Sequence, residues 1–451
     1  MRLKQLFSEI DMTQGTLWKK LALFAVPLLI GNLFQQLYTT IDAIMLGNFV
    51  GDYALAAVGS TMAPIFLITV LMMGIAIGAG VMVSQYFGAK QREDISRTIG
   101  NCITLTAIAG AAIMVIGLLV SRPLLVLLRT PPEVLDDSVI YINILLWGLL
   151  GMAYFNIFSG ILRGVGDAFS PLVYLAIASV LNIALNFITI AGLGWGVMGA
   201  ALGTVTSQAL TSLLCLRRIR QMREHFDIGL SYLRPQKMYT YQLLKLGVPT
   251  GVSHGVLAAA AIAVQPLANS FGPLVLAVYA VVTRVDGFVM MPNFSFGNAM
   301  NVYAGQNMGA GKVDRISKGT KQCALLAFGT AFALMVVITI FARQIAGLFT
   351  RTEEVLEMSV LFLRVLALGY LTFSVNMVLW GAIRGAGDAL TPMWASIINT
   401  IVIRVPVAYL LVHIMGEPVA LMYSLLIAWL TNTILAVVAY RIGKWRTKGI
   451  V

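Results

Sequence analysis

The chain has 451 residues, of which 59% are hydrophobic and only 11% are charged, and its formal net charge is +12. Soluble domains carry about 25% charged residues, so this composition excludes an ordinary soluble protein and predicts an integral membrane protein. Segments that cross a bilayer must satisfy their backbone hydrogen bonds internally, and long apolar segments therefore predict an all-α fold.

Twelve apolar segments are long enough, at about twenty residues each, to cross a ~30 Å hydrocarbon layer. They lie near residues 18–46, 55–85, 97–120, 139–161, 171–192, 196–216, 242–268, 274–303, 320–342, 358–382, 391–414 and 419–440. The predicted parts are an interfacial N-terminal segment (1–17), an N-terminal six-helix bundle (18–216), a cytoplasmic linker (217–241), a C-terminal six-helix bundle (242–440) and a basic cytoplasmic tail (441–451).

The distribution of Lys and Arg predicts the orientation of these spans. If the N-terminus is cytoplasmic, most basic residues fall on that side, and only Arg122, Arg129, Arg343 and Arg351 fall on the other. Basic residues collect in cytoplasmic loops, so we expect a multi-pass protein of the cell (inner) membrane with both termini in the cytoplasm. The positive charge then reflects topology and attraction to anionic lipid, and no nucleic-acid partner is predicted.

The first residues predict a short helix in the membrane surface. Leu3, Leu6, Phe7 and Ile10 have helical spacing beside basic residues, which is typical of an interfacial amphipathic helix. The segment as far as Lys20 lacks the apolar core and the small-residue cleavage site of a signal peptide. No cleavable signal peptide is therefore predicted.

The first span is too polar for a helix that faces lipid on all sides. Asp42 is a lone carboxylate in apolar sequence, and Gln35 and Tyr38 precede it in the same span. An ionisable residue within a membrane segment indicates a functional site, so we assign Asp42 to cation coupling and the other two residues to a substrate cavity. The alternative is that Asp42 lies at the outer end of the helix and reaches headgroup water near Gly47.

A polar tag occurs twice and reveals an internal duplication. The sequence ILRGVGDAFSP at 161–171 corresponds to AIRGAGDALTP at 382–392. Each tag lies between two apolar spans, so it predicts a sharp turn, with glycines for tight backbone and an Arg–Asp pair that caps the helix ends. The predicted turn residues are Arg163, Gly164, Gly166 and Asp167 in the first half and Arg384, Gly385, Gly387 and Asp388 in the second.

The fifth and sixth spans carry further polar side chains. Asn182 and Asn186 lie one turn apart on one helical face, and Thr204 lies in the next span. Amide and hydroxyl groups within a membrane are usually helix–helix contacts. Together with Asp42, however, these three residues indicate a cation-coupling site.

The second half lacks a carboxylate at the position of Asp42. Its second span instead carries Arg284 and Asp286, and then Met290, Met291 and Asn293. Residues two apart on a helix do not face each other, so we expect Asp286 to pair with Arg364 or Arg404 if it forms a structural ion pair. The alternative role, and our prediction, is a substrate cavity that these residues line, since Met provides an adaptable apolar surface. The predicted cavity residues of this half are Arg284, Asp286, Met290, Met291 and Asn293.

Several other kinds of site are excluded. The segment from Gln306 to Val313 fails as a phosphate loop, because Gln306 stands at the first Gly position and Val313 at the Ser/Thr position. The three Cys residues are scattered and predict neither a disulfide nor a metal site. No enzymatic activity and no cofactor are predicted, and the only metal considered is sodium at Asp42.

These residues together carry a resemblance to a known family. The chain resembles the multidrug and toxic compound extrusion (MATE) family along essentially its whole length. The resemblance rests on the first-span pattern Pro27…Asp42…Gly47, on Gly88-Ala89, on Leu162-Arg163-Gly164-x-Gly166-Asp167 with Pro171, and on the echo from Arg384 to Pro392.

The resemblance implies a V-shaped pair of pseudo-symmetric six-helix bundles arranged as parallel repeats, and alternating access driven by proton or sodium entry. Asp42, Asn182 and Thr204 match family positions of the cation site. Asn186 stands where relatives often carry an acid, so the coupling ion stays open.

The implied function is export of an organic cation or amphipath by a monomeric antiporter. A lipid-linked glycan flippase of the same superfamily is the alternative, and a membrane enzyme is a distant one.

Overall fold

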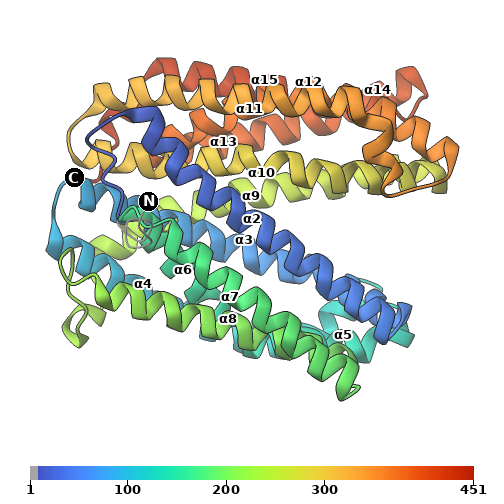
Figure 1. Cartoon of the computed structure of the whole chain (residues 1–451), viewed down its shortest axis with the longest axis horizontal. Coiled ribbons are helices and arrows are strands. Elements are labelled where there is room, and N and C mark those ends of the chain that lie inside the picture. The colour runs from blue at the N-terminus through green and yellow to red at the C-terminus, as the bar shows by residue number, and fades with distance from the viewer. Residues whose placement is uncertain (1–8) are drawn as a thin grey trace. The chain divides into compact units, whose positions relative to one another are not determined.

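The computed structural model describes residues 9–451, and within this range it contains helices and no β-strand (Figure 1). The predicted all-α class is thereby confirmed. The predicted interfacial helix rests mainly on Leu3, Leu6 and Phe7, which lie outside the described residues.

Two compact units divide the chain. The first consists of the residues up to Ile10 together with Ile30–Val248, and the second of Asp11–Leu29 together with Pro249–Val451. Two helices, α2 (Leu17–Phe49) and α9 (Lys237–Ser270), therefore contribute to both units. The units divide the chain inside these helices, whereas the sequence pattern places the division in the 217–241 segment.

Apart from its part of α2 and α9, each unit has its own set of helices. The first unit holds α3 (Asp52–Gly88), α4 (Arg92–Leu127), α5 (Pro132–Trp147), α6 (Leu149–Gly164), α7 (Phe169–Asn186), the π-helix η1 (Phe187–Gly192), α8 (Gly196–Gln221) and the 3₁₀-helix η2 (Leu230–Leu233). The second holds α10 (Pro273–Gly309), α11 (Val313–Gly347), α12 (Glu353–Gly385), α13 (Leu390–Ile398), the π-helix η3 (Asn399–Arg404), α14 (Val405–Met415), α15 (Ala420–Ile442) and the 3₁₀-helix η4 (Lys444–Thr447).

The described helices confirm the predicted number of membrane spans. Eleven are long and apolar enough to cross a membrane, and the bent pair α5 and α6 makes a twelfth. This pair bends by 50° at Gly148. Gly148 lies so close to α8 that a Cβ there would be 2.3 Å from Val205 Cγ2, which only glycine avoids.

Glycines also bring two helix backbones into close contact in the first unit, between α3 and α6. A Cβ on Gly160 would lie 2.4 Å from the Ala76 carbonyl oxygen, and one on Gly164 would lie 2.8 Å from the Gly80 carbonyl oxygen. Helix association in lipid relies on van der Waals contact between small residues, as in GxxxG pairs. Gly160 and Gly164 have this spacing and bring the two backbones together.

The second unit repeats this contact between α10 and α12. A Cβ on Gly381 would lie 2.3 Å from the Gly297 carbonyl oxygen, and one on Gly385 would lie 2.2 Å from the Asn301 carbonyl oxygen. Gly381 and Gly385 are the duplicates of Gly160 and Gly164 when the two tags are aligned, the first glycine of each pair lying just before its tag. The close contact between two helix backbones is therefore present in both halves of the duplicated sequence.

The repeated tags form sharp turns in both halves, as predicted. Gly166 has a φ of 96° and Gly387 a φ of 103°, which L side chains rarely adopt. Gly166 also lies against the chain near the N-terminus, where its carbonyl oxygen accepts a hydrogen bond from the Ile10 N–H at 3.1 Å.

The aspartates of the tags cap the helices that follow. Asp167 Oδ1 accepts from the Ser170 backbone N–H at 2.9 Å, and Asp388 Oδ1 accepts from the Thr391 N–H at 3.0 Å. Each aspartate lies just before its helix and satisfies a backbone N–H of the first turn that has no partner within the helix.

The prediction of an Arg–Asp pair within each tag is wrong. Arg218 on α8 donates through Nε to Asp167 Oδ2 at 2.9 Å, and within residues 9–451 no ion pair joins Arg163 to Asp167 or Arg384 to Asp388. The sequence prediction failed because the true partner of Asp167 comes from another helix.

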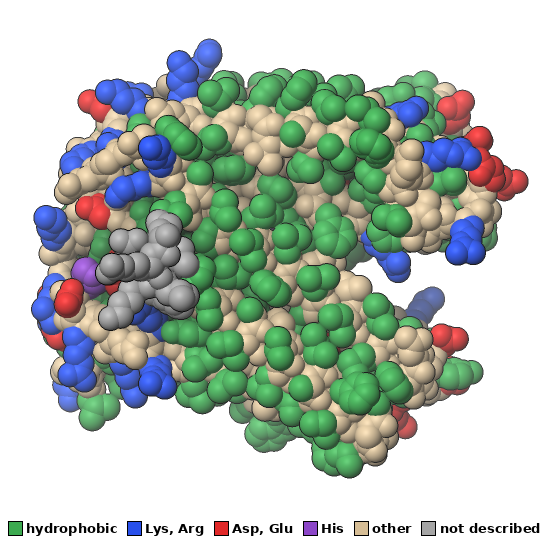
Figure 2. Space-filling model, viewed as in Figure 1, with side chains coloured by type: hydrophobic (Ala, Val, Ile, Leu, Met, Phe, Trp, Pro, Cys, Tyr) green, Lys and Arg blue, Asp and Glu red, His purple; other side chains and the backbone are tan. Residues whose placement is uncertain are grey.

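Hydrophobic side chains cover the middle of the helices on the face drawn in Figure 2, and Lys and Arg gather near helix ends. Large apolar side chains such as Leu119 and Leu127 on α4 are more than 70% exposed. A soluble protein would not expose such a continuous apolar surface. These surfaces are consistent with helices that face lipid.

We predict that Gly160→Val destabilises the first unit. The added side chain would overlap the α3 backbone, and such overpacking typically costs about 1–3 kcal/mol. Thermal unfolding of the purified protein in detergent measures the effect. Gly59→Ala, at a glycine of the facing helix α3, is the control, because a Cβ there meets nothing within 4 Å. An unchanged midpoint for Gly160→Val would contradict the close contact.

Candidate functional site

The candidate cation site is built around Asp42 on α2. Tyr38 and Asp42 are four residues apart, so they lie on one face of the helix. Both side chains are partly buried within the first unit. Gln35, which precedes them, is exposed, and its side chain makes no hydrogen bond to any residue of the described range 9–451. The face of α2 that enters the unit therefore carries one acid and one hydroxyl group.

Helix α7 presents two buried amides to this carboxylate. Asn182 and Asn186 are fully buried and lie one turn apart. Asn186 donates through Nδ2 to Asp42 Oδ1 at 2.6 Å and to Asn182 Oδ1 at 3.1 Å. The first bond is short, as expected for an acceptor that carries charge. One amide therefore links the acid to the rest of the polar cluster.

Thr204 on α8 completes the cluster. The Tyr38 hydroxyl donates to Thr204 Oγ1 at 3.0 Å, and Asn182 Nδ2 lies 3.4 Å from the Tyr38 hydroxyl. If the Asn182 amide is rotated by half a turn, its Nδ2 lies 2.8 Å from Asp42 Oδ1 and its Oδ1 accepts from the Thr204 N–H at 3.1 Å. The Asn182 amide can thus direct either its oxygen or its nitrogen toward the acid.

A glycine on α8 leaves space for the Asn186 amide. A Cβ on Gly203 would lie 2.1 Å from Asn186 Oδ1, so the Asn186 side chain would have to move. That oxygen is buried, and no described residue donates a hydrogen bond to it. A buried hydrogen-bond acceptor without a donor is uncommon in folded proteins. Here the unpaired Asn186 Oδ1 provides an oxygen beside the Asp42 carboxylate.

The π-helix η1 begins directly after Asn186. Single π-turns inside α-helices are rare and are frequent at functional sites. The second unit has a π-helix too, η3, in the corresponding span between α13 and α14. Sequence analysis missed both, because neither segment contains a residue pattern that distinguishes a π-turn from an α-turn.

The charge of this cluster is a single negative one. The described salt bridges include none to Asp42. Its surroundings are neutral oxygen and amide groups from Tyr38, Asn182, Asn186 and Thr204. Carboxylate and carbonyl oxygens are the ligands of hard cations, and a carboxylate also accepts a proton. The cluster can therefore be neutralised by one monovalent cation.

The second unit has no copy of this cluster. With Pro27 aligned to Pro249, Asp42 corresponds to Val264. Val264 is 4% exposed and packs in an apolar core with Ala408. The two halves therefore share a scaffold but not this site.

Asp286, the acid predicted to line a substrate cavity in the second half, lies on α10 and is half-buried. Its Oδ1 and the Tyr370 hydroxyl on α12 are both buried without a hydrogen bond among the described residues, although the two groups interact electrostatically. Arg404, the last residue of η3, also interacts with Asp286 over a distance longer than a salt bridge. Arg364 instead donates to the Thr339 carbonyl oxygen at 3.3 Å. Of the two partners considered for Asp286, only Arg404 is near.

The other predicted cavity residues of this half lie in different environments. Arg284 is exposed, whereas Met290 and Met291 are both 7% exposed and Asn293 is 1% exposed. Met290 packs in the core of the unit. The structure therefore places Asp286 with Tyr370 and Arg404 and does not gather the predicted set on one surface. Tyr370 was missed because an isolated tyrosine in an apolar span carries no distinguishing signal.

Comparisons with known proteins agree with this architecture. A model of the MatE family matches residues 27–188 and 249–410. The chain is 31% identical to the probable multidrug resistance protein YoeA of Bacillus subtilis, over 92% of this chain and 94% of that protein. It is 28% identical to YpnP, a probable multidrug resistance protein of the same organism, over 97% of each. A solved multidrug resistance MATE transporter in an outward-facing conformation is 25% identical, with a TM-score of 0.91 over 96% of this chain and 97% of that one.

We predict that Gly203→Ala disrupts the cluster. The new methyl group would push Asn186 away from Asp42, and overpacking of about 1–3 kcal/mol should exceed the gain of ~1 kcal/mol in helix propensity. The free energy of unfolding should fall, as measured by denaturation in detergent. Gly192→Ala at the end of η1 is the control, since its nearest contact would be an ordinary 3.8 Å. Equal effects of the two changes would refute the role of Gly203.

Proposed function

This chain belongs to the MatE family of multidrug efflux transporters, and we propose that it is an antiporter that exports organic cations or neutral amphipaths in exchange for a proton or a sodium ion. The observation that carries the coupling part of this proposal is the 2.6 Å hydrogen bond from Asn186 to Asp42 inside a cluster of neutral oxygens. A multi-pass membrane protein of this family needs no cofactor, and its energy source on this proposal is the ion gradient.

The charge balance of the cluster supports coupling to one monovalent cation. Asp42 is the only acid of the cluster, and no described salt bridge neutralises it. A lone carboxylate in a membrane segment is costly and is usually functional. A sodium ion could be coordinated by the Asp42 carboxylate and by the oxygens of Asn182, Asn186 and Thr204, whereas a proton would bind to the carboxylate alone. Either cation leaves the cluster neutral.

Neutralisation of Asp42 would change the hydrogen bonds that hold α2 to α7. The charged carboxylate accepts the Asn186 amide strongly, whereas a protonated or sodium-bound carboxylate accepts it less strongly. A ligand shifts a conformational equilibrium only through its different affinity for the two states. We therefore propose that the cation favours one arrangement of α2 and the exported compound favours the other.

The surroundings of Asp286 support an organic cation or a neutral amphipath as the exported compound. In the second unit, Phe373 on α12 contacts Phe294 at 5.9 Å and Trp429 at 5.4 Å between ring centroids. Tyr370 packs on Trp429 at 5.7 Å and also faces Asp286. Aromatic faces and a carboxylate both attract organic cations. A monomer suffices for this scheme, because each unit supplies its own groups.

We predict that Asp42→Asn abolishes ion-driven export while the protein still folds. The change is nearly isosteric, but the amide can neither release a proton nor hold a sodium ion by charge. Efflux of a cationic dye from proteoliposomes under an imposed proton or sodium gradient should fall to the level of protein-free liposomes.

Asp52→Asn, an exposed acid at the start of α3, is the matched control for Asp42→Asn. Wild-type efflux by the Asp42→Asn protein would remove Asp42 from the mechanism. Asn186→Asp should change the ion preference or the stoichiometry, since it adds a second negative charge to the cluster.

We also predict that both termini face the cytoplasm. Single cysteines at Asp52 and Glu417 should react with an impermeant thiol reagent from outside the cell, and one at Lys237 should not. These three positions are exposed, and the native Cys102, Cys215 and Cys323 are buried. Labelling at Lys237 together with protection at the other two positions would indicate the opposite topology.

A further inference from the structure

A cavity of about 850 Å³ opens in the first unit, away from the Asp42 cluster. It lies between α4, α6, α8 and the segment that connects α8 to α9. Its walls are mainly apolar and include Ile103, Phe158, Leu216, Phe226, Leu230 and Leu233. Small-molecule sites typically measure about 300–1,000 Å³ and are lined largely by apolar groups. The cavity is therefore large enough for an apolar chain.

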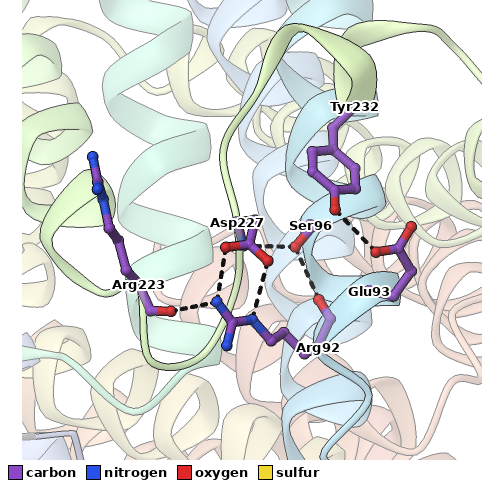
Figure 3. Close-up of polar contacts among 6 residues, drawn as sticks. All are labelled: Arg92, Glu93, Ser96, Arg223, Asp227 and Tyr232. Carbon is purple, nitrogen blue, oxygen red and sulfur yellow. Dashed lines mark hydrogen bonds and ion pairs between the residues drawn. The ribbon is translucent and has the colours of Figure 1, made fainter.

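The connecting segment that forms one wall is held in place by polar contacts (Figure 3). Asp227 accepts from Arg92 through both oxygens, at 2.7 Å and 3.1 Å, and its backbone N–H donates to Ser96 Oγ at 2.8 Å. The Tyr232 hydroxyl donates to Glu93 at 3.0 Å. These bonds fix the wall against α4, and they neutralise Asp227, the only acid among the described residues that line the cavity.

Two further arginines line the cavity without an ionic partner. Arg220 and Arg223 are exposed at the end of α8, and the described salt bridges include neither. The Arg223 carbonyl oxygen accepts from Arg92 at 2.7 Å, while its guanidinium group extends away from Asp227 (Figure 3). Since Asp227 is already paired with Arg92, the cavity has an excess of positive charge.

The apolar surface beside these arginines is open to the outside of the unit. Leu213 on α8 is 62% exposed and Leu230 is 86% exposed, and both line the cavity. Leu213 lies in a helix that is apolar enough to cross a membrane. An acyl chain from the surrounding bilayer could therefore enter along α8 while its headgroup stays at the helix end.

We propose that this cavity binds one anionic phospholipid, with an acyl chain between α4, α6 and α8 and the phosphate on Arg220 and Arg223. Basic pockets between membrane helices are suited to anionic headgroups. A soluble anion would leave the apolar walls exposed to water, and a zwitterionic lipid would bring a cation close to the two arginines. The site is separate from the Asp42 cluster and does not depend on the proposed export mechanism.

Native mass spectrometry of the detergent-purified full chain tests this proposal. Dioleoyl phosphatidylglycerol should form a one-to-one complex at concentrations where dioleoyl phosphatidylcholine does not. The double variant R220Q/R223Q should weaken phosphatidylglycerol binding by about tenfold or more, because it removes both unpaired positive charges that line the cavity.

The matched control is R217Q/R234Q, which removes two exposed arginines from the same region that do not line the cavity. It should bind phosphatidylglycerol as the wild type does. Equal losses in the two double variants would overturn the proposal in favour of nonspecific charge attraction. Equal binding of the two lipids by the wild type would also overturn it.

Two further measurements separate the acyl chain from the headgroup. Leu216→Trp should fill part of the cavity and weaken binding of phosphatidylglycerol, with an unchanged unfolding midpoint as the check on folding. Excess glycerol phosphate, which has the headgroup chemistry without acyl chains, should not displace the lipid. Full displacement by glycerol phosphate would indicate a site for a soluble anion and would contradict a lipid site.

Discussion

The close contact between two backbones in each unit is the constraint on which the rest of the fold depends. Lipid tails are as apolar as the side chains, so burying an apolar side chain between helices yields little free energy. Helices in a membrane therefore associate through short contacts between small residues. Gly160 and Gly164 bring α6 against α3, and Gly381 and Gly385 bring α12 against α10. Each pair ends in a tag whose aspartate caps the next helix. The glycines therefore determine where the following span begins.

The two halves have used this shared scaffold differently. In the first unit, α7 approaches α2 with two amides around Asp42. In the second, the equivalent position is Val264 in an apolar core, and the acid lies instead on α10 as Asp286. A site with one acid in neutral surroundings suits a small cation, whereas an acid beside aromatic rings suits an organic one. On the proposed mechanism, one unit responds to the ion and the other to the exported compound.

The fold could be predicted from the sequence because a bilayer allows few structures: a segment that crosses it must be long, apolar and internally hydrogen-bonded. Twelve apolar segments and the repeated tag predicted the spans and the duplication, since neither depends on distant contacts. In the candidate site, Asp42, Asn182, Asn186 and Thr204 were predicted as a group because polar residues are conspicuous in apolar spans, and the structure places them together.

Tertiary contacts were not predictable in this way. The partner of Asp167 is Arg218 on a different helix, and Gly203 matters only because α7 passes beside it. The two π-helices likewise depend on the packing of the spans around them. Met290 was expected in a cavity, but it packs in the core, because a methionine suits either place equally well.

On the proposed mechanism, one cation and the exported compound are linked through the Asp42 carboxylate. The most direct test is the affinity of the purified wild-type protein for a cationic dye, measured across a range of proton and sodium concentrations. Linkage is reciprocal, so dye affinity should fall as the concentration of one of these cations rises, with one cation displaced per dye molecule. Dye affinity that is independent of both cations, or displacement of two cations per dye, would contradict it.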